Sequence, residues 1–258
     1  MRIVVALKQV PDLVEELEPS PEGTDVDREY ITFVLNEFDD QALEEALLVK
    51  EATGAEVVVV ALEDSDVDQT LYTALAKGAD RAVKVTGAGA SGGWLDTHSR
   101  AALLAAWLEG QDFDLLITGV QAPDDLDGQL PAIVAGRLGL PHASVVVSVE
   151  VKDGAARIRQ EFSAGRSAVL EVPLPAVVGV QAARQAPRYA PISRIRQTMQ
   201  AGGIEEVAVE APPPASGFTI RRLYPPEKTS HAEMLTGSAG DVAARIVELL
   251  RAKGLVRA

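Results

Sequence analysis

The chain has no cysteine among its 258 residues, and histidine is scarce. The lack of cysteine excludes disulfides and thiolate chemistry. The three histidines, His98, His142 and His231, are too few and too scattered to suggest a zinc site. No acid in a loop has a histidine, serine or cysteine arranged beside it as a catalytic partner. A general-base or nucleophile constellation therefore cannot be assembled from the sequence.

Basic residues are also few, with 24 Lys and Arg against 38 Asp and Glu, for a net charge of -14. This charge opposes binding to nucleic acid or to an anionic membrane surface. No apolar run approaches the ~20 residues of a membrane span, and the N-terminal apolar stretch is too short for a signal-peptide core. We expect a soluble, cytoplasmic protein with no nucleic-acid partner and no direct membrane insertion.

The sequence does contain a regular alternation of apolar and amphipathic segments. Apolar runs at 2–8, 55–62, 81–86 and 113–119 are typical of strands buried on both faces of a parallel sheet. Helical spacing separates them at 36–54, 64–80 and 97–110, with Asn36 as a candidate N-cap and Gly54 and Gly78 as stops. This alternation predicts an α/β fold with a doubly wound, mostly parallel sheet.

The pattern changes after residue 139. Short runs at 142–151, 156–164 and 167–172 predict an antiparallel addition at one edge of the sheet, and 174–181 returns to it. A Pro-rich linker at 210–217 precedes a tail helix at 238–255. One face of that helix carries Val242, Ile246, Leu249 and Leu250, which suggests an arm laid on another subunit. We expect a nucleotide-binding domain over 1–200, and a linker and arm over 201–258.

The stretch GVQAPDDLDGQLP at 119–131 is the candidate binding loop. In open α/β sheets, ligands bind beyond the carboxyl ends of strands, here near Ala6, Leu62 and Gly119. Gly119 and Gly128 would let backbone N–H groups face a ligand oxygen, and the next helix begins nearby. The chain has neither GxGxxG after the first strand nor a P-loop.

The acids of this loop, Asp124, Asp125 and Asp127, have several possible roles. They could cap the loop's own amides or accept hydrogen bonds from ribose hydroxyls. An ordinary Asp-rich turn is the alternative.

A second outlier is the basic stretch between residues 182 and 200. It contains Arg184, Arg188, Arg194 and Arg196 and no acid, in a chain that is strongly acidic. On composition alone, a solvated basic helix explains it.

Five segments, in order, resemble the β subunit of electron-transfer flavoprotein: VALKQVPD, NEFDDQALEEALLVKE, YTALAKGADRAVKV, DLLITGVQAPDDLDGQLPAIVAGRLGLP and LPAVVGVQAARQAPRYAPISRIRQTMQ. The resemblance runs from Met1 to about Gln200. It implies an adenine-nucleotide α-hydrolase-like (Rossmann-like) fold and an αβ heterodimer. Such heterodimers accept electrons from acyl-CoA and related flavin dehydrogenases, as in fatty acid β-oxidation, and pass them to a quinone oxidoreductase. The resemblance further implies that the redox FAD lies mostly in the α subunit, and that this subunit holds a structural AMP and has no substrate turnover of its own.

The resemblance also assigns site residues. The AMP pocket falls on Ala6, Asn36, Glu37, Phe38, Asp39, Leu62, Gly119, Val120, Gln121, Ala122, Pro123, Asp124, Asp125, Leu126, Asp127, Gly128, Gln129 and Leu130. Leu13 and Phe38 fall where the family approaches the flavin ring of the partner subunit, although core packing would equally explain Phe38.

The chain departs from the family pattern at the phosphate. Leu130 stands where relatives often have a hydroxyl residue, and Gly128 where others have a side-chain amide. Backbone N–H groups and Gln129 are therefore expected to do more of the phosphate binding.

The basic stretch resembles the family's recognition loop, which docks on partner dehydrogenases. Ile192 would be the apolar anchor, with Arg188 and Tyr189 shaping the loop. The predicted partner-binding residues are Pro187, Arg188, Tyr189, Ile192, Arg194 and Ile195. Downstream, Gln197 and Gln200 replace family lysines, so electrostatic recruitment is expected to be weaker.

Two other functions remain open. An electron-bifurcating relative would oxidise NADH at a second FAD in the AMP position, but the loop lacks the Ser and Thr residues expected around a diphosphate. A stress-protein-like nucleotide sensor would explain the sheet and the loop, but neither the arginine-rich stretch nor the tail.

Overall fold

The computed structural model describes residues 1–29, 31–87, 95–125, 127–210, 220–225 and 232–256. The chain forms two compact units, Met1–Leu223 and Tyr224–Ala258. Each unit is described by itself below.

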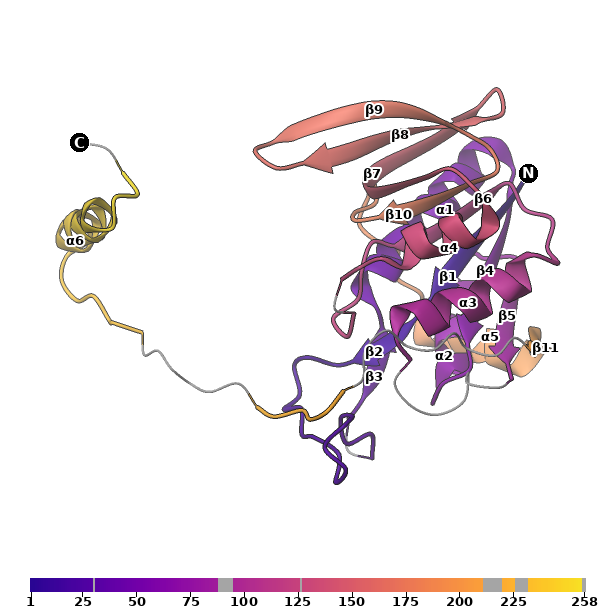
Figure 1. The fold of residues 1–258 in the computed structure, drawn as a ribbon, viewed down its shortest axis with the longest axis horizontal. Helices are drawn as coiled ribbons and strands as arrows, with labels where there is room; N and C mark the ends of the chain where they lie inside the picture. Colours follow the sequence, from indigo (N-terminus) through magenta and orange to yellow (C-terminus); the bar gives the residue numbers. More distant parts are fainter. Residues whose placement is uncertain (30, 88–94, 126, 211–219, 226–231, 257–258) are drawn as a thin grey trace. The chain divides into compact units, whose positions relative to one another are not determined.

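The first unit is built on a sheet of nine strands in the order β11-β5-β4-β1-β6-β10-β7-β8-β9 (Figure 1). Neighbours from β11 to β7 pair in parallel, whereas β7, β8 and β9 pair antiparallel. The predicted α/β class and antiparallel edge are confirmed. The strands are β1 (Arg2–Leu7), β4 (Glu56–Leu62), β5 (Arg81–Thr86), β6 (Leu115–Gly119), β7 (His142–Lys152), β8 (Ala155–Phe162), β9 (Arg166–Pro173), β10 (Ala176–Val180) and β11 (Ile204–Ala208).

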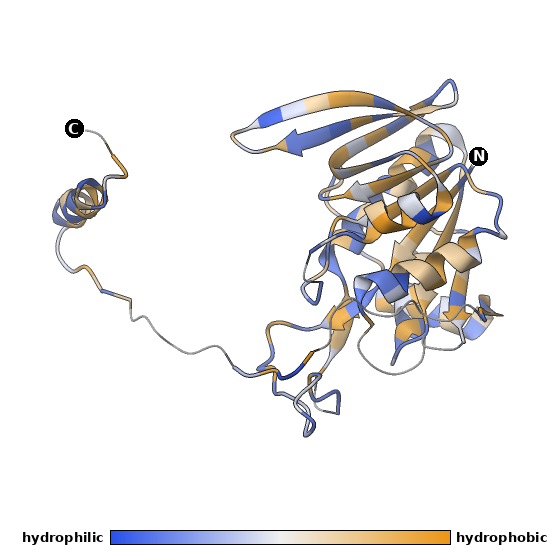
Figure 2. Cartoon of the chain, viewed as in Figure 1, coloured by the Kyte–Doolittle hydropathy of each residue, from blue (hydrophilic) through white to orange (hydrophobic). Residues whose placement is uncertain are grey.

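Helices cover both faces of the parallel strands, which are mostly coloured as hydrophobic in Figure 2. Alternate residues of β1 point to opposite cores: Val5 packs with the α1 and α2 residues, and Ala6 packs with those of α3 and α4. No helix in the described ranges is long and apolar enough to cross a bilayer. The helices of this unit are α1 (Glu37–Thr53), α2 (Val67–Lys77), α3 (Thr97–Leu108), α4 (Leu130–Leu138) and α5 (Ile192–Ala201).

Three short strands differ from the sequence expectation. β2 (Gln9–Pro11) and β3 (Phe33–Leu35) form a separate antiparallel pair between the first predicted strand and the first predicted helix, where no strand was expected. β11 joins the edge of the main sheet through β5, so the sheet continues past the expected domain boundary at residue 200. Strands this short are defined by backbone pairing and carry little hydrophobic pattern. The Pro-rich linker lies, apart from its first residue, outside the described residues.

The second unit contains α6 (Ala239–Ala252), which starts with a capping box between Ser238 and Asp241. No residue of α6, all of which is described, is buried. Val242, Leu249 and Leu250 are half-buried, and Ile246 is 44% exposed. The unit thus leaves an apolar surface on its helix.

Candidate functional site

The candidate binding loops meet at the carboxyl edge of the parallel sheet. β1 lies between β4 and β6, and the chain proceeds from β1 to β4 and β5 on one side before it returns to β6 on the other. This reversal is a topological switch point, where open α/β sheets bind ligands. The expected residues Ala6, Leu62 and Gly119 lie at the ends of these three strands or next to them.

The start of α1 ties two of these loops together. The Asp39 carboxylate accepts the backbone N–H of Lys8 at 2.8 Å and that of Gly119 at 2.9 Å. Asn36 occupies the N-cap position but makes no side-chain cap; its amide donates instead to the carbonyl of Gln121 at 2.9 Å. Asn36 is thus the N-cap residue, as expected, but its side chain bridges to the loop after β6 instead of capping the helix.

Gly119 is required by packing against α1. A Cβ at this position would lie 2.8 Å from the backbone carbon of Phe38 and would also meet the carboxylate of Asp39. The sequence predicts that the N–H of Gly119 faces a ligand. In the structure this N–H donates to Asp39 instead. Phe38 is half-buried at this contact.

The acids of the loop after β6 serve a buried lysine. Lys8 is 7% exposed, and its ammonium contacts Asp124 and, at 3.3 Å, Asp125. A buried cation without partners would be strongly destabilised. Asp124 and Asp125 therefore neutralise Lys8, whereas Asp127 is exposed. Leu126 lies outside the described residues.

The helix that follows the loop offers fewer donors than expected. α4 starts at Leu130, as predicted, but Pro131 in its first turn has no N–H. Gly128 has a φ of +60°, and a Cβ there would lie 2.9 Å from the Cβ of Gln121. Gly128 is thus needed for the loop's own conformation, whatever it binds.

Two cavities adjoin these loops. The smaller, of about 10 Å³, has room for about one water molecule, and its lining includes Ala6, Asp39, Leu62 and Leu130. The larger, of about 300 Å³, is in the range of small-molecule pockets, and its lining includes Gln9, Leu13, Phe33, Pro123 and Asp124. Arg100 of α3 lines both.

Several polar atoms near these cavities are buried without a hydrogen-bond partner. They are Oε1 of Gln9, Oδ1 of Asn36 and Nε of Arg100. Such atoms are uncommon in folded proteins and call for a ligand or an ordered water. Gln9 and Arg100 were not expected at the site, because no sequence motif marks either residue.

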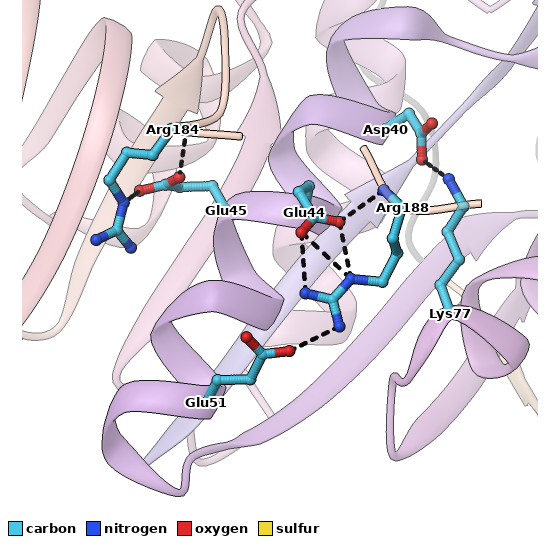
Figure 3. Close-up of polar contacts among 7 residues, drawn as sticks. All are labelled: Asp40, Glu44, Glu45, Glu51, Lys77, Arg184 and Arg188. Atoms are coloured by element: carbon cyan, nitrogen blue, oxygen red, sulfur yellow. Dashed lines mark hydrogen bonds and ion pairs between the residues drawn. The ribbon is translucent and has the colours of Figure 1, made fainter. Parts of the chain in front are cut away.

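The basic stretch is anchored to the same helix, α1, as Figure 3 shows. Glu44 accepts the backbone N–H of Arg188 at 2.9 Å and also binds its guanidinium, which reaches Glu51 at 2.7 Å. Glu45, fully buried, accepts the backbone N–H of Arg184 at 3.1 Å and its Nε at 2.9 Å. The acids that balance these arginines therefore lie on α1, far away in sequence.

The pKa values of the two acids reflect this arrangement. Burial raises the pKa of Glu45, although Arg184 and the N–H of Val149 oppose the shift. Burial also acts to raise the pKa of Glu44, but the hydrogen bonds from Arg188 outweigh this effect, so the pKa of Glu44 is lowered. No sequence pattern marks Glu44 or Glu45, because acids at these positions are typical of the exposed surface of a helix.

The anchored stretch presents an apolar surface beyond its arginines. Tyr189 is 79% exposed and Ile192 61%, and Met199, one heptad after Ile192 on α5, is 46% exposed. Pro187 and Ile195 are half-buried, and Arg194 is exposed. Arg188 is engaged with α1, which fits the expectation that it shapes the loop.

Comparison with known proteins identifies the family. A model described as the electron transfer flavoprotein domain matches residues 24–212. The chain is 36% identical to the electron transfer flavoprotein subunit beta of Methylophilus methylotrophus, over 97% of this chain and 98% of that protein. The chain belongs to the electron transfer flavoprotein β-subunit family.

Two further relatives have lower identity to this chain. The subunit beta of Mus musculus is 28% identical over 97% of this chain and 98% of its own length. The caffeyl-CoA reductase-Etf complex subunit CarD of Acetobacterium woodii is 30% identical over 99% of this chain and 100% of its own length.

Asp39 makes the stability of this electron transfer flavoprotein subunit dependent on pH. Burial raises the pKa of Asp39 to about 7 from an ordinary value of 3.8. Hydrogen bonds from the backbone N–H of Gly119, the side chain of Asn36 and the backbone N–H of Lys8 act in the opposite direction. Because the pKa of Asp39 is higher in the folded protein than in the unfolded chain, protonation of Asp39 stabilises the fold. This stabilisation is complete below pH 4 and is lost as the pH rises through 7. The limiting difference is about 4 kcal/mol.

Asp39→Asn should remove this dependence. Urea unfolding of wild type and variant should show wild type losing stability relative to Asp39→Asn between pH 5 and pH 8. The variant also loses one of two backbone acceptors, which costs about 1–3 kcal/mol at every pH. A wild-type advantage that does not change with pH would mean that Asp39 is ionised throughout this range.

Proposed function

We propose that this chain is the β subunit of a heterodimeric electron-transfer flavoprotein that shuttles electrons from flavin dehydrogenases, such as acyl-CoA dehydrogenases, to a quinone oxidoreductase. The observation that carries the proposal is the family match over nearly the whole chain. The chain would contribute no substrate turnover, because its role is to support the FAD held mostly by the α subunit. A stress-protein-like sensor does not account for this match.

We propose a structural AMP at the switch point. The smaller cavity cannot hold a nucleotide without movement of lining side chains such as Leu130, but the adjoining pocket of about 300 Å³ offers room. The unpartnered atoms of Gln9, Asn36 and Arg100 include both acceptors and a donor, as a base and a phosphate require. The residues present therefore fit an adenine nucleotide, which would act as a structural support.

Contacts to the α subunit and its FAD are proposed from two exposed apolar regions. Leu13 is 61% exposed and the adjacent Val14 93% exposed, on the segment that follows β2. α6 leaves its apolar face uncovered within its own unit. Exposed apolar surface of this kind marks a subunit contact, and we assign both regions to the α subunit.

Docking of dehydrogenases is proposed for Tyr189, Ile192 and Met199. An apolar side chain on a well-anchored segment makes a good interface anchor, because little conformational entropy is lost when the partner binds. The bonds from Glu44 and Glu45 provide that anchoring. Arg194, which is exposed, would assist the approach of an acidic partner.

A bifurcating function is the second candidate. The similarity to a subunit of a caffeyl-CoA reductase-Etf complex extends over the full chain. In this case a second FAD would take the place of AMP. The pocket of about 300 Å³ beside the smaller cavity adds room for the larger ligand.

The composition of the purified complex tests these proposals together. We expect co-expression with the α subunit to give a heterodimer that releases one FAD and one AMP on denaturation, as measured by absorbance and chromatography. Two FAD per heterodimer would support the bifurcating function. A flavin-free chain that does not associate with the α subunit would contradict both.

Ile192→Ala tests the docking surface. Loss of one buried apolar side chain is worth about 1–3 kcal/mol, so flavin reduction by an acyl-CoA dehydrogenase and its acyl-CoA should need roughly ten- to hundredfold more heterodimer for half-saturation. Val169→Ala, which truncates another exposed aliphatic residue on β9, is the control. Reduction by dithionite should be equal in all proteins. If Ile192→Ala needs the same heterodimer concentration for half-saturation as wild type, α5 is a solvated basic helix and not a docking surface.

A further inference from the structure

Arg100 is the unusual charge at this site. It lies near the start of α3 and lines both the smaller cavity and the larger pocket. Its Nε is buried and has no hydrogen-bond partner. Within the part of the chain that the structure describes, its guanidinium makes no salt bridge.

The other charged residues around the pocket are already paired. Arg28 binds Asp25 at 3.0 Å and Asp64 at 2.9 Å, so this group carries a net charge of about -1. Lys8 binds Asp124 and Asp125, with the same net charge. A phosphate placed here without a further cation would be repelled, because charges in a poorly solvated site interact strongly. Arg100 supplies a positive charge that forms no salt bridge within the described residues and can therefore face a phosphate directly.

The loop after β6 has few groups that can replace Arg100 in this role. Gly119 donates its N–H to Asp39, and Pro131 has none. Leu130 and Gly128 have no polar side chain, and Leu130 lines the smaller cavity together with Arg100. A guanidinium, by contrast, presents several donors in the planar geometry that matches phosphate oxygens.

We propose that Arg100 is the residue that binds the phosphate of the adenine nucleotide in this subunit. The inference rests on the proposed nucleotide site and adds the side chain that recognises its anionic group. Arg100 thereby sets the preference of the site for a nucleotide over a nucleoside. α3 thus supplies the side chain that binds the phosphate, whereas the loop after β6 mainly contacts Lys8 and α1.

The test compares AMP with adenosine, which differ only in the phosphate. Heterodimer stripped of bound nucleotide is titrated with each compound by calorimetry, for wild type, Arg100→Gln and Arg100→Lys. Arg137→Gln removes a charge from an exposed position on α4 and serves as the matched control. FAD content and circular dichroism establish that each variant is folded.

We expect Arg100→Gln to weaken AMP binding roughly ten- to hundredfold and to leave adenosine binding unchanged. Arg100→Lys should be intermediate, and Arg137→Gln should match wild type. Equal loss for AMP and adenosine, or no loss for AMP, would overturn the assignment of Arg100 and leave the nucleotide site in place. Failure of wild type to bind AMP at all would overturn the nucleotide site itself, and the assignment with it.

Discussion

The structure depends on backbone N–H groups that donate to side chains of α1. Asp39 accepts two of them, Gln41 accepts that of Ala183 at 2.9 Å, and Glu44 and Glu45 accept those of Arg188 and Arg184. Hydrogen bonds to a carboxylate are stronger than those between neutral groups, and a buried carboxylate without donors would be costly. The donors to Asp39, Glu44 and Glu45 thus satisfy carboxyl groups that the helix could not otherwise bury.

This single helix supports both proposed functional regions. Its first turn holds the loops after β1 and β6 at the switch point, and its middle turns hold the segment after β10 that presents Tyr189 and Ile192. The loop after β6 also contacts the end of β10 directly, since the N–H of Val120 donates to the carbonyl of Val180 at 2.9 Å. Substitutions in α1 are therefore expected to affect nucleotide binding and dehydrogenase docking together.

Much of the fold could be predicted because it rests on local patterns. The apolar runs of β1, β4, β5 and β6 and the helical spacing of α1 are visible in windows of a few residues. The side-chain pairings could not be predicted, because Lys8 and Asp124, or Glu44 and Arg188, are more than a hundred residues apart. For the same reason, the sequence predicts a ligand or turn role for Asp124 and Asp125 of the loop after β6, whereas these two acids neutralise a lysine.

Amide hydrogen exchange of the purified heterodimer tests the role of α1 most directly. The account predicts that the amides of Gly119, Arg184 and Arg188 exchange orders of magnitude more slowly than those of Gln185 and Tyr189, whose N–H groups have no partner among the described residues. Arg184, Gln185, Arg188 and Tyr189 lie outside helices and strands, and Gly119, the last residue of β6, donates to Asp39, so hydrogen bonds of regular secondary structure do not explain the difference. Equally fast exchange at all five would contradict the claim that α1 holds these loops.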